Sequence, residues 1–366
     1  MENNSLLHRI KEGILDTCYI CVREMRGTIT DEGVLIFCVL VPLLYPLLYS
    51  WIYNNEVVRE VPVAIVDQSH TNASREYIRK FDASPDTKVA YYCTSLEEAK
   101  DLTAKQQVHG TLYFPEDFER RLYRGEQTKV GVYCDMSLML TYKAIYQTAQ
   151  AVASDMNAQI QIAQSTDYTK RDNEITTKPL DFDEVPIFNT TGGYGNAILP
   201  GVLMLILQQT LLLGIGLAAG TARENNRFKD LVPISKHYTG IFRIVLGKAL
   251  CYFMIYMVMG AYLALVIPHL YHFTSLVSAQ AIIGLMVPYI LACTFFGMML
   301  SCLVRYRENV MLLVVFSSVP FLFMTGLSWP QSNIPGFWQG VATIIPSTFG
   351  VRGFMRISSM GATLQD

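Results

Sequence analysis

The chain has 366 residues, of which 51% are hydrophobic and 16% are charged, and its formal net charge is −2. So apolar a balance excludes most soluble enzymes and is typical of a membrane protein that also carries a water-exposed domain. Residues 54–194 hold 15 Lys and Arg against 21 Asp and Glu. An acidic surface of this kind argues against a nucleic-acid partner.

The leading segment, residues 1–32, contains an amphipathic stretch between residues 15 and 26. Apolar residues such as Ile20 and Met25 stand there among the charges of Arg23, Glu24 and Arg26. This pattern predicts a helix that lies on the inner membrane face. No small-residue cleavage site precedes the first apolar run, so we expect that run to be a retained signal anchor.

An uncharged run at residues 33–53 is long enough to cross a bilayer as a helix, and Pro42 and Pro46 predict a kink in it. Residues 54–194 are too polar to lie in lipid. Strand and helix signals alternate along them, which predicts an inserted extracytoplasmic α/β domain. We expect strands at 61–66, 87–93, 108–114 and 128–134, helices at 74–81, 95–106, 116–123 and 137–164, and an irregular strut at 166–186.

Two cysteines, Cys93 and Cys134, each end a predicted strand of this domain. Disulfides persist outside the cytoplasm. The two thiols could therefore form a bridge if their strands are neighbours in the sheet, and the sequence leaves the strand order open.

Four further apolar runs form a membrane block over residues 195–329, with spans expected at 197–222, 241–268, 278–304 and 310–329. Lys and Arg number four in residues 1–32, six in 223–248 and two in 305–309, but none in 269–279 and two after 329. The positive-inside rule places the N-terminus and the loop 223–240 in the cytoplasm, and residues 54–194 and 330–366 outside. The predicted fold is an α-helical integral membrane protein with five visible spans and one inserted α/β domain.

Polar and flexible residues cluster around the second predicted span. Gln208 and Gln209 lie in its middle, and amides in hydrocarbon must face protein or a watery path, so they either join helices or line a conduit. Gly192, Gly193 and Gly195 predict a hinge before the span. The run around these glycines resembles a potassium filter, but a filter needs a preceding pore helix between two spans.

No pattern typical of a catalytic or metal site stands out. Cys18 and Cys21 have redox spacing without a second pair, and His269 and His272 lack a third ligand. The stretch 240–248 is not a phosphate-binding loop, because six residues separate its glycines and no Ser or Thr follows the lysine.

The loop after the second span combines charges with apolar residues at helical spacing. Its members are Arg223, Glu224, Arg227, Phe228, Leu231, Val232 and Pro233. This spacing predicts a short amphipathic helix that docks in a groove of another protein. The alternative is a solvated loop that merely obeys the positive-inside rule.

In these features the chain resembles the permeases of the ABC-2-type exporter family, in the class with a large insert between the first two spans. The resemblance covers almost the whole chain. It rests on Arg23-Glu24, residues 61–67 and 81–85, Phe188-Asn189, Pro200-Gly201, the loop 223–233, and residues 326–330, 334–335 and 345–348. The family has Pro where Thr190 stands here, and its sixth span is absent from the chain, so we expect it to follow Asp366.

The resemblance implies a permease subunit of an exporter that moves an amphipathic, drug-like or lipid-like substrate across a bacterial cytoplasmic (inner) membrane. It implies ATP-binding-cassette ATPase subunits, which would carry the ATP and Mg and engage the loop 223–233 together with Arg23 and Glu24. It also implies a second permease copy or paralogue, and it allows a periplasmic adaptor as a further partner. Pro200, Gly201, Gln208 and Gln209 are then candidates for the translocation path, and no cofactor is expected on this chain.

Two other classes of function remain open at this point. A membrane-anchored receptor or adhesion protein would use its spans only as an anchor, and the loop 223–233 would be dispensable. An ion-coupled transporter would need ionisable residues in the middle of its spans, and the sequence has none there.

The predicted orientation can be tested with reporter fusions. GFP fused after Asn225 should fluoresce, and alkaline phosphatase fused after Asp366 should be active, because basic loops stay in the cytoplasm. Exchanging the two reporters provides the control. An inactive phosphatase after Asp366 would show that the span count is wrong by one.

Overall fold

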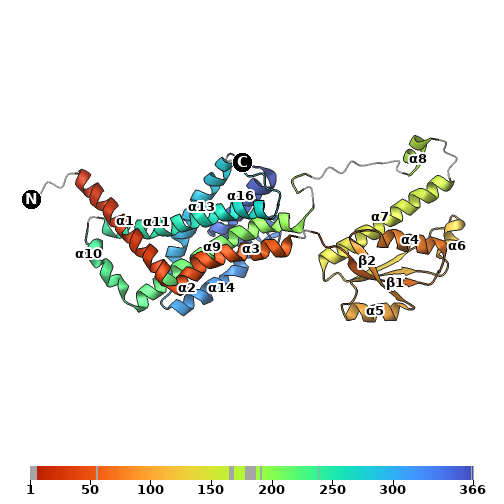
Figure 1. Cartoon of the computed structure of the whole chain (residues 1–366), viewed down its shortest axis with the longest axis horizontal. Coiled ribbons are helices and arrows are strands. Elements are labelled where there is room, and N and C mark those ends of the chain that lie inside the picture. Colours follow the sequence, from red (N-terminus) through yellow and green to blue (C-terminus); the bar gives the residue numbers. More distant parts are fainter. Residues whose placement is uncertain are drawn as a thin grey trace, which may run out of the picture. The chain divides into compact units, whose positions relative to one another are not determined.

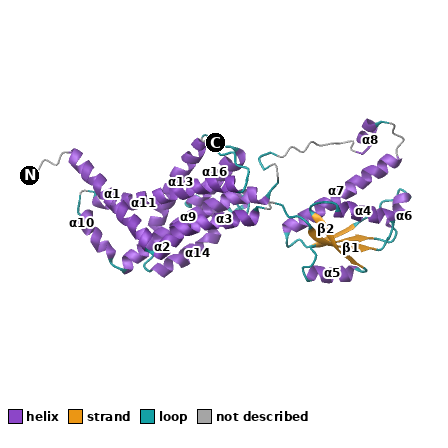
Figure 2. Ribbon diagram, viewed as in Figure 1, coloured by secondary structure: helices purple, strands orange, loops and turns teal. Residues whose placement is uncertain are grey.

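The computed structural model describes residues 6–54, 57–164, 169–177, 187–189, 192–237, 239–363 and 365. The chain divides into two compact units: a membrane unit made of residues 1–56 and 186–366, and an α/β unit made of residues 57–185. Figure 1 labels many elements of both units, and Figure 2 shows that the strands belong to the second unit.

Among the described residues, five helices are long and apolar enough to cross a membrane: Glu32–Tyr53, Tyr194–Glu224, Gly240–Leu270, Ala279–Leu303 and Arg307–Met324. The first consists of α2 (Glu32–Leu35), a π turn at Ile36–Leu40 and α3 (Val41–Tyr53). The third consists of α11 (Gly240–Ala261), a π turn at Tyr262–Val266 and α12 (Ile267–Leu270). The prediction of a helical membrane protein is confirmed.

Both π turns lie just before a proline, and proline explains them. Pro42 and Pro268 lack an N–H, and the ring of each would clash with the carbonyl four residues earlier, which in both cases belongs to the π turn. Widening the helix by one residue relieves the clash. The first span is therefore irregular before Pro42, whereas Pro46 lies inside α3, and a kink in this span stays a prediction.

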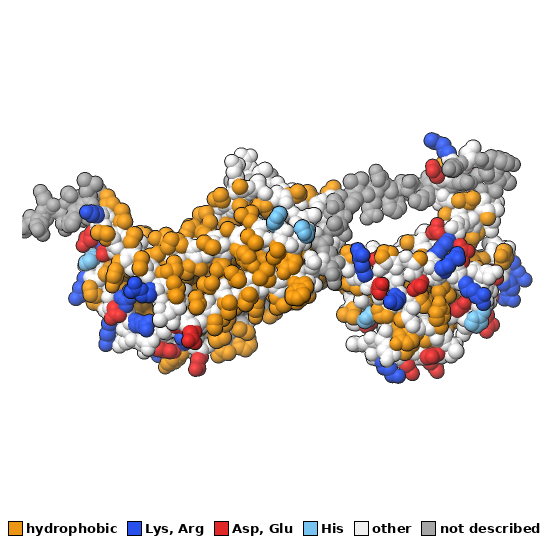
Figure 3. Space-filling model, in the orientation of Figure 1, with side chains coloured by type: hydrophobic (Ala, Val, Ile, Leu, Met, Phe, Trp, Pro, Cys, Tyr) orange, Lys and Arg blue, Asp and Glu red, His pale blue; other side chains and the backbone are white. Residues whose placement is uncertain are grey.

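The long helix α9 (Tyr194–Glu224) is the centre of the membrane unit and packs against α3, α13, α14 and α16. Gly214 allows the first span to come close, because a Cβ there would lie 2.0 Å from Sγ of Cys38. Figure 3 shows a broad apolar surface on this unit, with charged side chains gathered at the end where α10 (Val232–Ser235) lies. Such a surface matches a bilayer, whose core excludes charge.

The fifth span ends earlier than predicted. α14 (Arg307–Met324) stops at Met324 rather than at Trp329, because Gly326 adopts a left-handed backbone with φ +84° that ends the helix. Arg352 stabilises this end, since its Nε donates to the backbone oxygen of Thr325 at 3.0 Å and its charge faces the helix C-terminus. Arg352 belongs to α16 (Pro346–Met360), which follows α15 (Gly336–Ala342) and packs on α9 and α13 (Ala279–Leu303).

A four-stranded sheet in the order β2-β1-β3-β4 forms the α/β unit. Its strands are β1 (Val61–Asp67), β2 (Thr87–Cys93), β3 (Gly110–Phe114) and β4 (Gly131–Cys134). β1 is parallel to β2 and β3, whereas β4 is antiparallel to β3. Parallel strands need crossover connections, which α4 (Asn72–Asp82) and α5 (Leu96–Ala104) supply.

Two apolar clusters determine which helices cover each face of the sheet. Phe81 of α4 and Ile145 of α7 (Met139–Gln164) pack with Ile65 on one face, joined by α6 (Phe118–Tyr123). Ala99 of α5 packs with Val66 on the other face. The sheet is therefore covered by helices on both sides, as an α/β arrangement requires.

The disulfide left open between Cys93 and Cys134 is excluded by the sheet. Cys93 ends β2 and Cys134 ends β4, and these strands are opposite edges separated by β1 and β3. The two side chains also lie on opposite faces, since Cys93 packs with Val66 and Cys134 packs in the cluster of Ile145. Both thiols are free, and burial raises the pKa of Cys134 to about 11.

Part of the strut predicted as irregular at residues 166–186 is helical. α8 (Lys170–Thr177) begins directly after Thr169. The Oγ1 of Thr169 accepts a hydrogen bond from the backbone N–H of Asp172 at 3.2 Å. This is an N-cap, which the sequence reading missed. Residues 166–168 and 178–186 of the strut lie outside the described residues.

The α/β unit should fold when residues 57–164 are expressed alone, because both apolar clusters lie within that segment. Phe81 is fully buried, so Phe81→Ala should lower the free energy of unfolding by about 3–5 kcal/mol. Urea titration followed by circular dichroism measures the change. Tyr123→Ala is the matched control, since that ring is 84% exposed and its loss should cost less than about 0.5 kcal/mol. Equal effects would contradict the described core.

Candidate functional site

Helix α1 (Leu6–Thr30) packs along α11, and polar side chains hold the two together. Nη1 of the buried Arg243 lies 2.6 Å from Oδ2 of Asp16, and Nδ1 of His237 lies 2.9 Å from the same oxygen. Burial alone would raise the pKa of Asp16, but hydrogen bonds with His237 and Arg243 outweigh it and hold the pKa below its ordinary value. The charged carboxylate therefore anchors α1 to α11.

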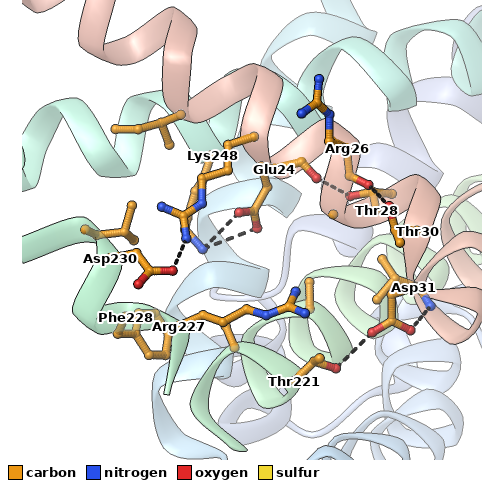
Figure 4. A pocket seen from close by; sticks show the side chains of 17 residues that line it. Glu24, Arg26, Thr28, Thr30, Asp31, Thr221, Arg227, Phe228, Asp230 and Lys248 are labelled. Atoms are coloured by element: carbon orange, nitrogen blue, oxygen red, sulfur yellow. Dashed lines mark hydrogen bonds and ion pairs between the residues drawn. The ribbon is translucent and has the colours of Figure 1, made fainter. Parts of the chain in front are cut away.

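Further along α1, a second group of contacts borders a cavity of about 310 Å³ (Figure 4). Nη2 of Arg23 lies 2.7 Å from Oδ2 of Asp230, in a 3₁₀ turn at Arg227–Leu231. Both carboxylate oxygens of Glu24 lie 3.2 Å from Nζ of Lys248 in α11. Adjacent residues of α1 thus reach two different elements.

A third group of contacts joins the ends of three spans. Oδ1 of Asp31 lies 2.7 Å from Nη2 of Arg307, and Oδ2 accepts from Oγ1 of Thr221 at 3.0 Å. The backbone N–H of Arg307 donates to Oε1 of Glu224 at 2.9 Å. Burial would raise the pKa of Asp31, but hydrogen bonds from Arg307 and Thr221 outweigh it and lower the pKa. The start of the first span, the end of α9 and the start of α14 are therefore tied together.

The loop after α9 consists of the 3₁₀ turn and the one-turn helix α10, rather than one amphipathic helix. Asn226 has a left-handed backbone with φ +54°, which separates the 3₁₀ turn from α9. Phe228 and Val232 are 39% and 44% exposed, Pro233 is also exposed, and Leu231 is half-buried. This surface, formed by Phe228, Leu231, Val232 and Pro233, is called the exposed apolar loop.

The remaining charged residues predicted for coupling have separate positions. Arg223 donates to the backbone oxygens of Cys302, at 3.2 Å, and of Val304, at the C-terminus of α13. Arg227 lines the cavity and makes no ion pair within the described residues. The structure therefore brings all nine predicted coupling residues to one end of the membrane unit, with Arg23, Glu24, Arg223 and Glu224 used in contacts inside the chain.

Several polar residues of this site were missed by sequence reasoning: Asp31, Thr221, Asp230, Lys248 and Arg307. One signal was available, because Asp31 stands two residues before an apolar run and caps the first helical turn through the N–H groups of Gly33 and Val34. Its partner Arg307 is 276 residues away along the chain, so only the fold reveals the pair.

The four residues proposed for a translocation path lie along α9. Gln208 is fully buried, its Oε1 accepts from Sγ of Cys293 at 3.6 Å, and its Nε2 has no partner among the described residues. Gln209 is half-buried, and its amide atoms also lack described partners. Pro200 and Gly201 lie two turns nearer the start of the helix, and a Cβ on Gly201 would lie 2.7 Å from Leu327. A path along these residues stays a prediction.

The three glycines of the predicted hinge differ in conformation. Gly192 has a left-handed backbone with φ +63° and open space around it. Gly193 is the N-cap of α9, and its oxygen accepts from Nδ2 of Asn189 at 2.9 Å. Gly195 lies inside α9, where a Cβ would come within 2.9 Å of the Tyr53 oxygen. Conformational freedom therefore resides at Gly192, Gly195 serves close packing, and the hinge itself stays a prediction.

Within the described ranges, no group of three or more His, Cys, Asp or Glu side chains is arranged to hold a metal ion.

The chain matches the family described as ABC-2 family transporter protein over residues 33–366. The linearmycin resistance permease protein LnrN of Bacillus subtilis (strain 168) is 23% identical over 342 residues, which cover 88% of this chain and 86% of that protein. No solved structure matches the chain.

The chain therefore belongs to the ABC-2 family of transporter proteins. It is a multi-pass membrane permease and the transport subunit of an ABC transporter, and ATP hydrolysis belongs to a partner ATPase.

The tie between Asp31 and Arg307 should contribute measurably to stability. Asp31→Asn keeps the helix cap but removes the charge, and it should lower the free energy of unfolding by about 1.5–3 kcal/mol, the range for hydrogen bonds to charged groups. Titration of the purified protein with SDS measures unfolding. Asp230→Asn is the matched control, since its pair with Arg23 is exposed and should contribute less than about 1 kcal/mol. An equal loss in both variants would contradict the special role of Asp31.

Proposed function

We propose that this chain is the permease subunit of an ATP-binding-cassette exporter that moves an amphipathic, drug-like or lipid-like compound out of the cytoplasm or inner leaflet. The observation that carries the proposal is the exposed apolar loop, whose neighbouring residues are bonded to three other helices. Neighbouring apolar residues that are exposed together, on a loop with fixed connections at its ends, favour a docking surface over a merely solvated loop.

The proposed partner is an ATPase that binds ATP and Mg and receives the exposed apolar loop in a groove. Phe228 and Val232 would insert as apolar anchors, and Arg227, which makes no ion pair with a described residue, would meet an acidic side chain of the partner. Arg23 and Glu24 contribute by holding α1 against this loop and α11, rather than by facing the partner themselves.

Movement of the loop would reach the spans through the bonds already described. Arg23 connects the loop to α1 through Asp230, Arg223 connects its start to α13, and Glu224 connects it to α14. Closure of the ATPases would then shift these helices together, which converts nucleotide binding into opening and closing of a path. Such coupling needs two states with different contacts, and ion pairs at span ends can exchange partners between states.

The proposed class of substrate is supported by the name of the relative. The relative is named a resistance permease for linearmycin, which supports export of a drug-like compound by this chain as well. We place the path between two permease copies or paralogues in a bacterial inner membrane, with the N-terminus in the cytoplasm and residues 54–194 outside, where an adaptor could bind. Gly192 would provide the bend between residues 54–191 and α9.

Truncation of the main apolar anchor tests the function. Phe228→Ala should leave the permease folded in the membrane but reduce co-purification of its ATPase or lower drug export at least tenfold, because the ring would no longer fill the partner's groove. Export is measured as drug accumulation in cells, and binding as the ATPase retained on the tagged permease.

Phe337→Ala is the matched control, since it removes another exposed phenylalanine, on α15. Normal ATPase binding together with wild-type export in the Phe228 variant would refute the coupling role. Failure of any ATPase to co-purify with the unaltered chain would favour the anchored receptor or adhesion protein instead.

A further inference from the structure

The α/β unit contains a cavity of about 670 Å³ that the proposed export mechanism does not use. It lies at the carboxyl ends of β1 and β2, beside α4, elements that can be located in Figure 1. In open α/β sheets, ligands commonly bind beyond the carboxyl ends of the strands. The volume is sufficient for a small organic molecule.

The apolar part of the cavity comes from three side chains. Ile65 of β1 and Ile78 of α4 are buried and form its inner wall, and Tyr92 of β2 is 71% exposed at its edge. An exposed aromatic ring beside buried aliphatic groups offers a surface on which an apolar chain can lie. β2 is an edge strand of the described sheet, so Tyr92 lies at the margin of the sheet.

The basic part of the cavity comes from α4. Arg75 and Arg79 are four residues apart, so they lie on the same side of the helix, and both line the cavity. Neither guanidinium makes an ion pair or side-chain hydrogen bond within the described residues. Lys80 on the same helix differs, because its Nζ lies 2.8 Å from Oδ2 of Asp155 and 3.2 Å from Oε1 of Glu76. The cavity side of α4 therefore carries basic groups that are free to bind a ligand.

Two carboxylates also line the cavity, and both are bonded within the unit. Oδ1 of Asp67 accepts from the N–H groups of Ser69 and His70 at 3.0 and 3.1 Å, and its Oδ2 accepts from Ser74 Oγ at 2.8 Å. Oδ1 of Asp82 accepts from the backbone N–H of Val89 at 2.8 Å. These bonds hold the loop after β1 and the strand β2 in place beside the arginines.

We propose that this cavity is a binding site for an amphipathic anion. A carboxylate or phosphate group would accept paired hydrogen bonds from Arg75 and Arg79, and the apolar chain of the ligand would lie on the exposed ring of Tyr92, next to Ile78. The guanidinium fork matches both acid groups in geometry and charge. The site belongs to the α/β unit alone, so it goes beyond the proposed function and does not depend on ATP-driven export.

Calorimetric titration of the full chain in phosphatidylcholine nanodiscs tests the site, with octanoate, octyl phosphate, octanol and inorganic phosphate as probes. Octanoate and octyl phosphate should each bind to one saturable site, while octanol and inorganic phosphate should bind at least tenfold more weakly. The double variant Arg75→Gln/Arg79→Gln should lose at least tenfold in affinity for octanoate. Arg120→Gln/Arg124→Gln is the matched control, since it removes two arginines at the same spacing that do not line the cavity.

Both double variants should keep the circular dichroism spectrum and melting temperature of the parent, because the altered arginines are exposed. Equal losses in the two variants would reduce the effect to overall charge and overturn the proposal. If octanol binds as tightly as octanoate, the proposed recognition of the acid group is wrong. If inorganic phosphate binds as tightly as octyl phosphate, the proposed recognition of the apolar chain is wrong. Replacing part of the phosphatidylcholine with phosphatidylglycerol identifies the source: competition with octanoate supports a lipid headgroup in the site, and unchanged affinity supports a dissolved ligand.

Discussion

The ion pair of Asp31 with Arg307, completed by the hydroxyl of Thr221, is the contact on which the arrangement of the membrane unit depends most. Helices in lipid gain little from apolar contact with one another, because the surrounding tails are equally apolar. Close packing and a few polar bonds must therefore specify which helices are neighbours. Here one carboxylate caps the first span, bonds the end of α9 and fixes the start of α14.

The other polar contacts extend this arrangement outward from α9. Arg223 and Glu224, at the end of the same helix, bond the end of α13 and the start of α14. Glu24 and Arg23 then add α1, which lies against α11 and the exposed apolar loop. The site proposed for the ATPase is thus built from bonds between span ends, and its exposed apolar residues sit where those bonds converge.

Hydropathy was sufficient to predict the number of spans and that they are helices, because an uncharged run of about twenty residues is typical of a membrane-spanning helix. The order of strands and helices in residues 57–164 followed from their alternating patterns. The neighbours of each strand could not be predicted, since pairing of β1 with both β2 and β3 depends on crossover connections. The strand order then decided whether Cys93 and Cys134 could form a disulfide.

The predicted end of the fifth span was wrong because Gly326 looks unremarkable inside an apolar run until its φ is known. In the candidate site, the motif residues could be named from sequence, whereas partners such as Arg307 and Lys248 lie more than 200 residues away and could not.

The π turn at Ile36–Leu40 has a consequence for the second half of the first span. One additional residue in a turn advances every later side chain by about 100° around the helix axis. The row Tyr45, Tyr49 and Tyr53, whose rings contact one another in sequence, therefore faces a direction set by this turn and not by the residues before it. Deleting one residue within Ile36–Leu40 would remove the additional residue, turn that aromatic row away from its neighbours and separate Tyr53 from Tyr194 of α9. A single turn of the backbone thus determines the direction in which the side chains of half a span face.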